Sequence, residues 1–241
     1  MKKQGIQIFC DFDGTITRGD TVDLLLETLA DPQWREIEAR WERGEIGSRE
    51  CMALQVPMIR GGWQSILKVL DSVQVDNSFA PFVSWCRLRK IPISIVSDGL
   101  DRVIQHLLAR ENVKVDRVWA NQLYDDSQGR LSLRFPEAWH RVVCSSGLCK
   151  CQVLDQAGPQ PLKVVIGDGR SDFCWARNAD LLFAKDKLLK HCQAHNISHL
   201  PFDNFVQIRV LLEELISAGE PERVAARSAA KLVEAPLLAQ S

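Results

Sequence analysis

The most informative stretch of this chain is Ile6-Gln7-Ile8-Phe9-Cys10-Asp11-Phe12-Asp13-Gly14-Thr15. A short apolar run ends in two carboxylates, which a Gly-Thr turn follows. The run predicts a buried strand, and two like charges at its end repel each other and are costly to desolvate. A hard cation such as Mg²⁺, which prefers oxygen ligands, is the usual way to offset that cost. The stretch therefore predicts a ligand site at a strand end. The alternative is an ordinary Asp-Gly turn.

The composition is typical of a protein with a sizeable core. The 241 residues are 46% hydrophobic and 25% charged, which suits one large domain or a core with a smaller insertion. A formal net charge of −1 without a long basic run makes nucleic acid a poor candidate partner. No apolar stretch approaches the ~20 residues of a membrane span. The first apolar run stops at Asp11 and is too short for a signal peptide, so we expect a cytoplasmic protein with reduced cysteines.

Apolar strands alternate with helical segments after about residue 81. This alternation predicts an α/β fold with a doubly wound parallel sheet, resembling a Rossmann-like core. Residues 124–133 resemble a hairpin. The expected strands are 6–10, 91–97, 115–119, 163–167 and 181–183, and the expected helices are 81–88, 101–110, 150–156, 171–177, 185–195 and 211–216.

The segment after the first strand has only helical character. Four short helices are expected between residues 21 and 70, with Asp20 or Thr21 capping the first and Ser48 capping the third. Glycines at 44, 47, 61 and 62 separate the later helices. We therefore expect a small inserted helical cap at residues 19–75 and a core of residues 1–18 and 76–218. Residues 219–241 form a C-terminal tail, predicted to be either a loosely attached helix or disordered.

Three expected strands end in polar residues, and the carboxyl ends of parallel strands share one edge of the sheet. This edge gathers acids, a hydroxyl group and Gly-rich turns, and Lys150 opens the helix that precedes the last of these strands. The inventory suits phosphoryl chemistry. The Ser97 hydroxyl and the Lys150 ammonium can bind phosphate, and Asp11 and Asp168 can bind Mg²⁺. A carboxylate can also attack phosphorus, and Asp13 is close enough in sequence to donate a proton.

Each of these residues also has an ordinary structural interpretation. Ser97 can cap the helix that follows it, Lys150 can be a solvated surface lysine, and Asp172 can be an acid in the first turn of a helix. The agreement of several strand and helix ends favours the functional interpretation.

Four stretches of the chain carry these residues: Asp11-Phe12-Asp13-Gly14-Thr15, Ile95-Val96-Ser97, Lys150 and Gly167-Asp168-Gly169-Arg170-Ser171-Asp172. They resemble the four motifs of the haloacid dehalogenase superfamily of phosphatases. The helical insertion is similar to the small cap of its subfamily IB, the phosphoserine-phosphatase-like branch. Three stretches more loosely resemble the methionine-salvage branch, which acts on a hydroxy-keto-methylthiopentenyl phosphate. They are residues 9–17 with Asp20, the region of Cys144, Lys150 and Cys151, and residues 200–205. Two departures from the phosphoserine branch are Asp98-Gly99 after Ser97 and Ser171 in the last motif.

The resemblance implies a set of roles at the site. It implies that Asp11 is a nucleophile that also binds Mg²⁺, and that Asp13 is a general acid and base whose backbone carbonyl binds the metal. It implies that Ser97 and Lys150 hold the phosphoryl group. Asp168 and Asp172 are the further acids that it implies, which bind the metal or support its waters or the lysine. Gly99, beside Ser97, is expected to contact the substrate.

Two further acids are candidates for contact with the leaving group. Asp20 lies where phosphoserine phosphatases place an acid against the substrate ammonium, and Asp98 lies beside Ser97. We expect one or both to contact a polar or cationic leaving group. The alternative for Asp20 is a helix cap.

The cysteines fall into two groups. One dense group contains His140, Cys144, Cys149 and Cys151, which are ligand types that zinc uses. Because the group lacks a Cys-x-x-Cys pair, we favour structural or lid-lining thiols. The remaining cysteines are expected to be small buried hydrophobes: Cys10, Cys51, Cys86, Cys174 and Cys192.

The sequence thus predicts a Mg²⁺-dependent phosphatase acting on a small phosphorylated metabolite, with methionine salvage as one candidate pathway. Alternatives are a phosphoserine or amino-alcohol phosphate phosphatase, a phosphotransferase, a carbon–halogen hydrolase and a non-catalytic phosphometabolite sensor. Asp13 argues against the halide reaction, because a halide leaving group needs no proton. The nucleophile argues against the sensor. The chain is expected to be a monomer or a homodimer.

Overall fold

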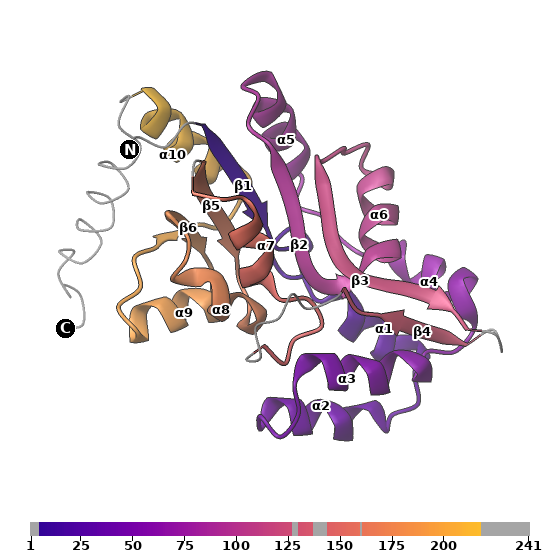
Figure 1. Ribbon diagram of the computed structural model, residues 1–241. Helices are drawn as coiled ribbons and strands as arrows, with labels where there is room; N and C mark the ends of the chain where they lie inside the picture. Colours follow the sequence, from indigo (N-terminus) through magenta and orange to yellow (C-terminus); the bar gives the residue numbers. More distant parts are fainter. Residues whose placement is uncertain (1–4, 127–129, 137–143, 160, 218–241) are drawn as a thin grey trace, which may run out of the picture.

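The computed structural model describes residues 5–126, 130–136, 144–159 and 161–217 (Figure 1). Within these ranges, seven strands form one sheet in the order β4-β3-β2-β1-β5-β6-β7. Neighbouring strands run parallel, except for the antiparallel pair β3 and β4. The predicted α/β class with a doubly wound sheet is confirmed. The strands are β1 (Ile6–Cys10), β2 (Ile93–Leu100), β3 (Arg117–Asp125), β4 (Leu131–Arg134), β5 (Leu162–Gly167), β6 (Leu181–Ala184) and β7 (Leu200–Pro201).

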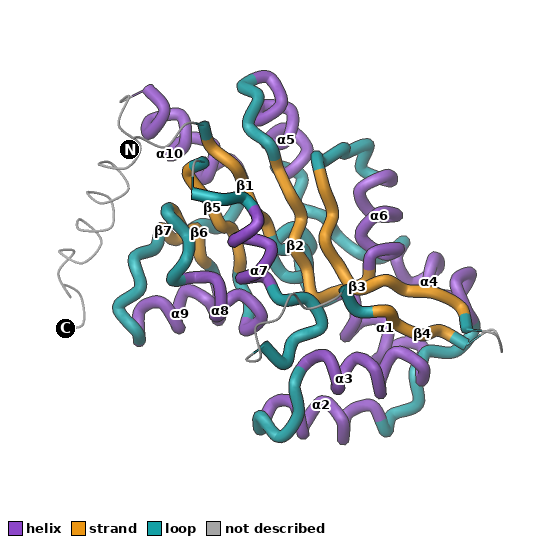
Figure 2. Tube along the Cα trace, viewed as in Figure 1, coloured by secondary structure: helices purple, strands orange, loops and turns teal. Residues whose placement is uncertain are grey.

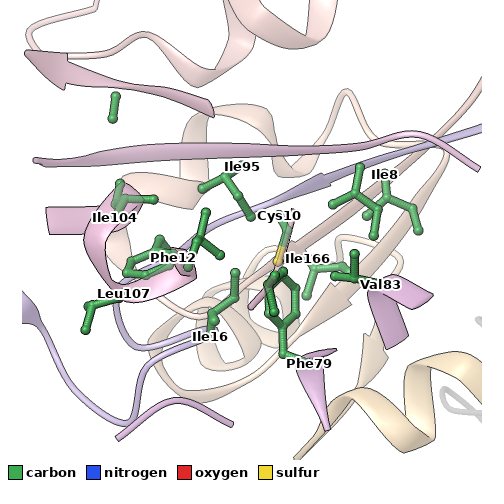
Figure 3. Close-up of a cluster of buried hydrophobic side chains, with 14 of the residues drawn as sticks. Ile8, Cys10, Phe12, Ile16, Phe79, Val83, Ile95, Ile104, Leu107 and Ile166 are labelled. Atoms are coloured by element: carbon green, nitrogen blue, oxygen red, sulfur yellow. The ribbon is translucent and has the colours of Figure 1, made fainter. Parts of the chain in front are cut away.

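Helices cover both faces of the sheet (Figure 2). Successive side chains of a strand point to opposite faces, so Ile8 and Cys10 join one apolar cluster and Phe9 joins the other. The first cluster is completed by α5 (Phe79–Leu88), α6 (Asp101–Arg110) and α10 (Phe205–Ser217), and Figure 3 shows part of it. The second is completed by α7 (Lys150–Gln156), α8 (Phe173–Ala176) and α9 (Asp186–Ala194).

Four helices follow β1 and lie near the β3–β4 end of the sheet (Figure 1). Their buried side chains, among them Leu25 and Leu70, belong to the first apolar cluster. Thr17 pairs with Val75 in an antiparallel bridge, so the chain leaves and re-enters the core at neighbouring points. We call these helices the cap, and its boundaries at 19 and 75 stay a prediction. They are α1 (Thr21–Leu29), α2 (Trp34–Glu42), α3 (Ser48–Gln55), which continues into the 3-10 turn η1 (Val56–Met58), and α4 (Gly62–Leu70).

The structure corrects several expectations. β2 continues to Leu100 instead of ending at Ser97, because the chain keeps pairing with β3 beyond a local irregularity. The strand expected at 115–119 extends to Asp125, and α10 begins at Phe205. The short strand β7 was not expected. Ser48 is the first residue of α3 and not its cap.

Some expectations fall outside the described residues. These are the hairpin turn at 127–129, His140 and the tail at 219–241. In the ranges that the structure describes, every helix is too short or too polar to cross a bilayer.

Candidate active site

The site lies at the carboxyl edge of the sheet, where β1, β2 and β5 are neighbours. Asp11 directly follows β1, Asp168 directly follows β5, and Ser97 lies within β2 at the irregularity between Val96 and Leu100. Lys150 is the first residue of α7, which packs on the face shared by Phe9 and Val165. The parallel order therefore brings residues that are far apart in sequence to one edge.

A buried ion network connects these strand ends. Lys150 Nζ lies 2.8 Å from Asp11 Oδ1 and 2.7 Å from Asp172 Oδ1, and all three side chains are buried. Burial and the Asp172 carboxylate raise the pKa of Asp11 well above its ordinary value. Burial alone would lower the pKa of Lys150, but the two carboxylates raise it above its ordinary value. A charged ammonium group is therefore fixed beside the Asp11 carboxylate, where it can attract an anion.

The two oxygens of Asp11 differ in their surroundings. Oδ1 accepts a hydrogen bond from the backbone N–H of Phe12 at 2.8 Å in addition to its contact with Lys150. No donor among the described residues reaches Oδ2. One oxygen is thus anchored, and the other is available to an incoming group.

Asp172 is oriented by its own loop, which includes the 3-10 turn η2 (Arg170–Asp172). Its Oδ2 accepts the backbone N–H groups of Asp168 at 3.1 Å and Gly169 at 3.0 Å, while Oδ1 faces Lys150. With both oxygens engaged, Asp172 holds Lys150 in place and fixes the loop that carries Asp168.

Three acids form a candidate cation site. Oxygen atoms of Asp11, Asp168 and Asp172 all lie within 4.8 Å of one another. Thr15 Oγ1 donates to Asp168 Oδ1 at 2.5 Å, and burial raises the pKa of Asp168 to about 6. Gly14 has a φ of 75°, and a Cβ there would overlap the Asp168 carboxylate, so only glycine allows this close approach. Clustered carboxylate oxygens are hard ligands, so the donor set fits Mg²⁺.

Asp13 lies between the cap and β2. Its Oδ1 accepts from Thr21 Oγ1 at 2.6 Å and from Thr21 N at 2.9 Å, and its Oδ2 accepts from Ser97 Oγ at 3.3 Å. Burial and the neighbouring Asp20 carboxylate raise the pKa of Asp13 to about 7. A carboxyl group with such a pKa can donate and accept a proton near neutral pH.

Ser97 and Gly99 complete this side of the site. Ser97 is 1% exposed, and its Oγ accepts a hydrogen bond from Gly99 N at 2.9 Å. A Cβ at Gly99 would overlap the Asp13 carboxylate. The absence of a side chain therefore keeps Asp13 and Ser97 close together.

Asp20 caps the first helix of the cap. Its Oδ1 accepts from Val22 N at 2.8 Å and from Asp23 N at 3.1 Å. Since the first N–H groups of a helix have no partner within it, this contact satisfies two of them. The expectation that Asp20 contacts the leaving group stays a prediction, and its capping role is established by the geometry.

Asp98 contacts protein groups on both of its oxygens. Oδ2 accepts from Ser48 Oγ at 2.5 Å, while Oδ1 accepts from Leu148 N at 2.8 Å and from Asn121 Nδ2 at 3.1 Å. Burial raises the pKa of Asp98 above its ordinary value, and these donors oppose the rise. Asp98 thus joins the cap to two segments of the core.

A second contact joins the cap to the core at Arg170. Its Nη1 donates to the Glu42 carbonyl at 3.2 Å, and its guanidinium carbon lies 5.2 Å from the centre of the Trp41 ring. Residues 41–49, the end of α2 and the start of α3, thus reach both β2 and the loop after β5. We call the contacts of residues 41–49 with the core the cap seam.

The cysteines do not follow one pattern. Cys174 is exposed, contrary to expectation, and its thiol shares a hydrogen bond with that of Cys151. Cys144 contacts Cys149 and lies 2.5 Å from Ser146 Oγ. Within the described residues, these thiols do not join any group of three clustered metal ligands.

Residues 8–177 match the family of haloacid dehalogenase-like hydrolases. Because this match spans more than half of the sequence, the chain belongs to that family. The predicted enzyme class, a hydrolase with phosphatase relatives, is thereby confirmed.

Two sets of known proteins are similar to the chain. The 2-hydroxy-3-keto-5-methylthiopentenyl-1-phosphate phosphatases of Bacillus cereus (strain 03BB102) and Bacillus anthracis are each 28% identical over 215 residues, 88% of this chain and 97% of theirs. A substrate-bound phosphoserine phosphatase has a TM-score of 0.59 at 17% identity, covering 79% of this chain and 91% of its own. A phosphoserine phosphohydrolase-like protein of Francisella tularensis has a TM-score of 0.62 at 20% identity, covering 86% and 99%. These structures share the fold.

Sequence reasoning missed three residues that the structure brings to the site. Thr21 binds Asp13, and Ser48 and Asn121 bind Asp98. The sequence places Thr21 and Ser48 at helix starts, where hydroxyl groups are common. It carries no signal for their partners, because both partners lie in the core: Asp13 in the turn after β1 and Asp98 on β2.

Proposed function

We propose that this chain is a Mg²⁺-dependent phosphatase that hydrolyses a small-molecule phosphate monoester through an aspartyl-phosphate on Asp11. The observation that carries the proposal is the buried Lys150, bound to Asp11 and Asp172 beside Asp168. Burying a lysine costs free energy unless it is paired with a carboxylate. A buried Lys150 beside a carboxylate with one unpartnered oxygen supports a site in which the lysine binds the phosphoryl group and the carboxylate attacks phosphorus.

The residues divide the reaction between them. Asp11 Oδ2 attacks phosphorus, while Lys150 and the Ser97 hydroxyl hold the phosphoryl oxygens. Asp13, protonated at the start because its pKa is about 7, gives its proton to the leaving oxygen. The Asp13 carboxylate then takes a proton from the water that hydrolyses the acyl phosphate, which restores both acids.

The candidate cation would be held by Asp11 and Asp168, with Asp172 supporting the site and Lys150. Asp13 is proposed to contribute its backbone carbonyl. When bound, the cation offsets the charge of the phosphoryl group and of the clustered carboxylates.

The substrate proposal rests on similarity and on the cap. The 28% identity extends over nearly the whole length of the methylthiopentenyl phosphate phosphatases, which supports a related phosphate ester as substrate. The alternative, phosphoserine or an amino-alcohol phosphate, is supported by the acids around the start of α1, which include Asp13, Asp20 and Asp23.

The free thiols of all eight cysteines support a reducing compartment such as the cytoplasm.

The test is hydrolysis of p-nitrophenyl phosphate by the wild-type chain, Asp11→Asn and the matched control Asp71→Asn. We expect Asp11→Asn to lower kcat by roughly 10³-fold or more, whereas Asp71→Asn, an exposed acid in the cap, retains activity. Chelation should abolish turnover and added Mg²⁺ should restore it. Full activity of Asp11→Asn, or of metal-stripped protein, contradicts the proposal.

The substrate class is tested separately. Hydrolysis rates for 2-hydroxy-3-keto-5-methylthiopentenyl-1-phosphate are compared with those for phosphoserine and phosphoethanolamine. Faster hydrolysis of the methylthiopentenyl ester supports a substrate with an uncharged leaving group. Faster hydrolysis of the two ammonium-bearing esters supports an amino-alcohol phosphate as substrate.

A further inference from the structure

Asp98 lies in an irregular part of β2. In the pairing of β2 with β3, Val96 lies opposite Trp119 and Leu100 lies opposite Asn121. Between these two pairs β2 advances by four residues and β3 by only two. Extra residues on one strand form a bulge, and a bulge re-aims the side chains within it. The bulge explains why the Asp98 side chain contacts residues of the cap and core instead of following the regular alternation.

Both oxygens of Asp98 are occupied by donors from three segments. Ser48 of the cap binds Oδ2, while Leu148 N and Asn121 Nδ2 bind Oδ1. Asn121 Nδ2 also donates to the Asp98 carbonyl at 2.6 Å, which fixes the bulge itself. An acid with three protein donors is satisfied within the protein. This finding argues against the sequence expectation that Asp98 contacts the leaving group.

The segment before Lys150 is fitted closely against Asp98. A Cβ at Gly147 would come within 2.6 Å of Asp98 Oδ1 and 2.7 Å of Asn121 Nδ2, so the position requires glycine. The next residue, Leu148, is 4% exposed and donates its backbone N–H to the same oxygen. Because α7 begins two residues later at Lys150, this hydrogen bond fixes the point from which Lys150 enters the site.

The start of α3 lies on the same part of the core. A Cβ at Gly47 would overlap the backbone carbonyl of Ser145, and the N–H of Arg49 donates to that carbonyl at 3.1 Å. The first-turn N–H groups of a helix lack partners within it, and its positive dipole end favours nearby anions. Both effects stabilise the packing of the start of α3 on the core, where the Ser48 hydroxyl donates to Asp98.

We propose that Asp98 is a positioning residue that couples the seating of the cap, through Ser48, to the placement of Lys150, through Leu148. The inference rests on the proposed function, which assigns Lys150 to the phosphoryl group. When α3 leaves the core, Asp98 exchanges the Ser48 hydroxyl for water and its carboxylate can rotate, which loosens the bond to Leu148. A seated cap and an ordered Lys150 therefore favour each other.

A double-mutant cycle tests this coupling. We expect kcat/KM for p-nitrophenyl phosphate with Mg²⁺ to fall about 5-fold in Ser48→Ala and about 30-fold in Asp98→Ala. The double variant should be no worse than Asp98→Ala, because Ser48 acts through Asp98. Ser72→Ala, the same change at an exposed hydroxyl elsewhere in the cap, serves as the control and should match the wild type. Losses that multiply, or an unaffected Ser48→Ala, overturn the coupling.

Asp98→Asn separates positioning from substrate contact and preserves the local shape. Its amide oxygen can still accept from Leu148 and Asn121, and its amide nitrogen can donate to Ser48. We expect activity within about 3-fold of the wild type on both p-nitrophenyl phosphate and phosphoethanolamine. A direct contact with a cationic leaving group predicts instead a large loss confined to phosphoethanolamine, which would refute the positioning role.

The two proposals fail in different ways. A wild-type chain that does not hydrolyse phosphate esters, or a fully active Asp11→Asn, refutes the proposed function. An active wild type with an inactive Asp11→Asn but independent effects at Ser48 and Asp98 refutes only the coupling.

Discussion

The carboxyl edge of the sheet and the cap seam hold their polar groups in different ways. At the edge, Lys150 is 1% exposed and is bound by two carboxylates of the core. At the seam, single contacts join the two parts, such as the Ser48 hydroxyl on Asp98 and the exposed Arg170 on Trp41. Charged pairs in a buried place are costly to break, whereas exposed or neutral contacts contribute little each.

This difference indicates that the charged groups of the site belong to the core, whereas the cap acts on them from outside. The ion network of the edge lies wholly within the core, and the proposed route from the cap to Lys150 runs through Asp98 and Leu148. The polar contacts of the seam contribute little each, although the cap also shares the first apolar cluster with the core. Changes at the edge should therefore have large effects, and changes at the seam small ones.

The largest effect is expected for Lys150→Met. The change leaves Asp11 and Asp172 buried without their cation, which should lower the free energy of unfolding by about 3–5 kcal/mol at neutral pH. Turnover should fall on the order of 10²–10³-fold, because the phosphoryl group loses a charged donor. Urea unfolding and steady-state kinetics measure the two effects, with Lys68→Met, an exposed cap lysine, as the control. A stable and active Lys150→Met would remove the distinction between edge and seam.

The pH dependence of stability tests the acids of the edge. The pKa of Asp168, raised by burial to about 6, exceeds its ordinary unfolded value of about 4. The folded state then binds more protons between these values, so this group makes the chain less stable as pH rises through 6. In chelator-treated protein, the Tm of the wild type relative to Asp168→Asn should fall between pH 5 and pH 7.5.

Magnesium supplies the internal control for that measurement. Added Mg²⁺ should raise the Tm of the wild type at pH 7.5, since a cation bound to the folded state stabilises it, and should leave Asp168→Asn almost unchanged. A Tm difference that is independent of pH and of Mg²⁺ would contradict a cation site at Asp168.

A smaller effect is expected at the start of the cap. Asp20→Ala removes the cap of α1 and should lower the free energy of unfolding by about 1 kcal/mol. Asp20→Asn keeps the acceptor and should retain stability. If Asp20 also contacts an ammonium group, Asp20→Asn should lower activity with phosphoethanolamine but not with p-nitrophenyl phosphate. Equal stability of the alanine and asparagine variants would argue against the capping role.

The smallest effect is expected at the exposed side of the seam. Arg170→Ala removes the contacts with Glu42 and Trp41, and an exposed cation–π contact contributes about 0.5–1 kcal/mol. We expect kcat/KM to fall about 3-fold. Arg43→Ala, at a neighbouring exposed arginine of the cap, should have no effect. A loss of kcat/KM as large as that expected for Lys150→Met would show that Arg170 acts like the buried groups of the edge and not like a contact of the seam.

Much of the fold could be predicted from local pattern. Apolar runs fixed the strands at 6–10 and 163–167 closely, because buried parallel strands are apolar throughout. The extension of β2 through Asp98 and Gly99 could not be predicted, since these residue types usually end strands and only the pairing with β3 keeps them in the sheet. Cys174 was misplaced because a short helix carries too little periodicity to show its exposed side.

The order of residues along the chain was enough to predict the α/β fold and the residues that gather at one edge of the sheet. Asp11, Ser97 and Asp168 meet because parallel strands align their carboxyl ends, and this follows from the order of apolar runs along the chain. The tertiary structure alone decided the partners of each group. Ser48 and Asp98 are separated by 50 residues and lie on different parts of the molecule, so their contact depends on how the cap packs against a bulged strand, which no local pattern encodes.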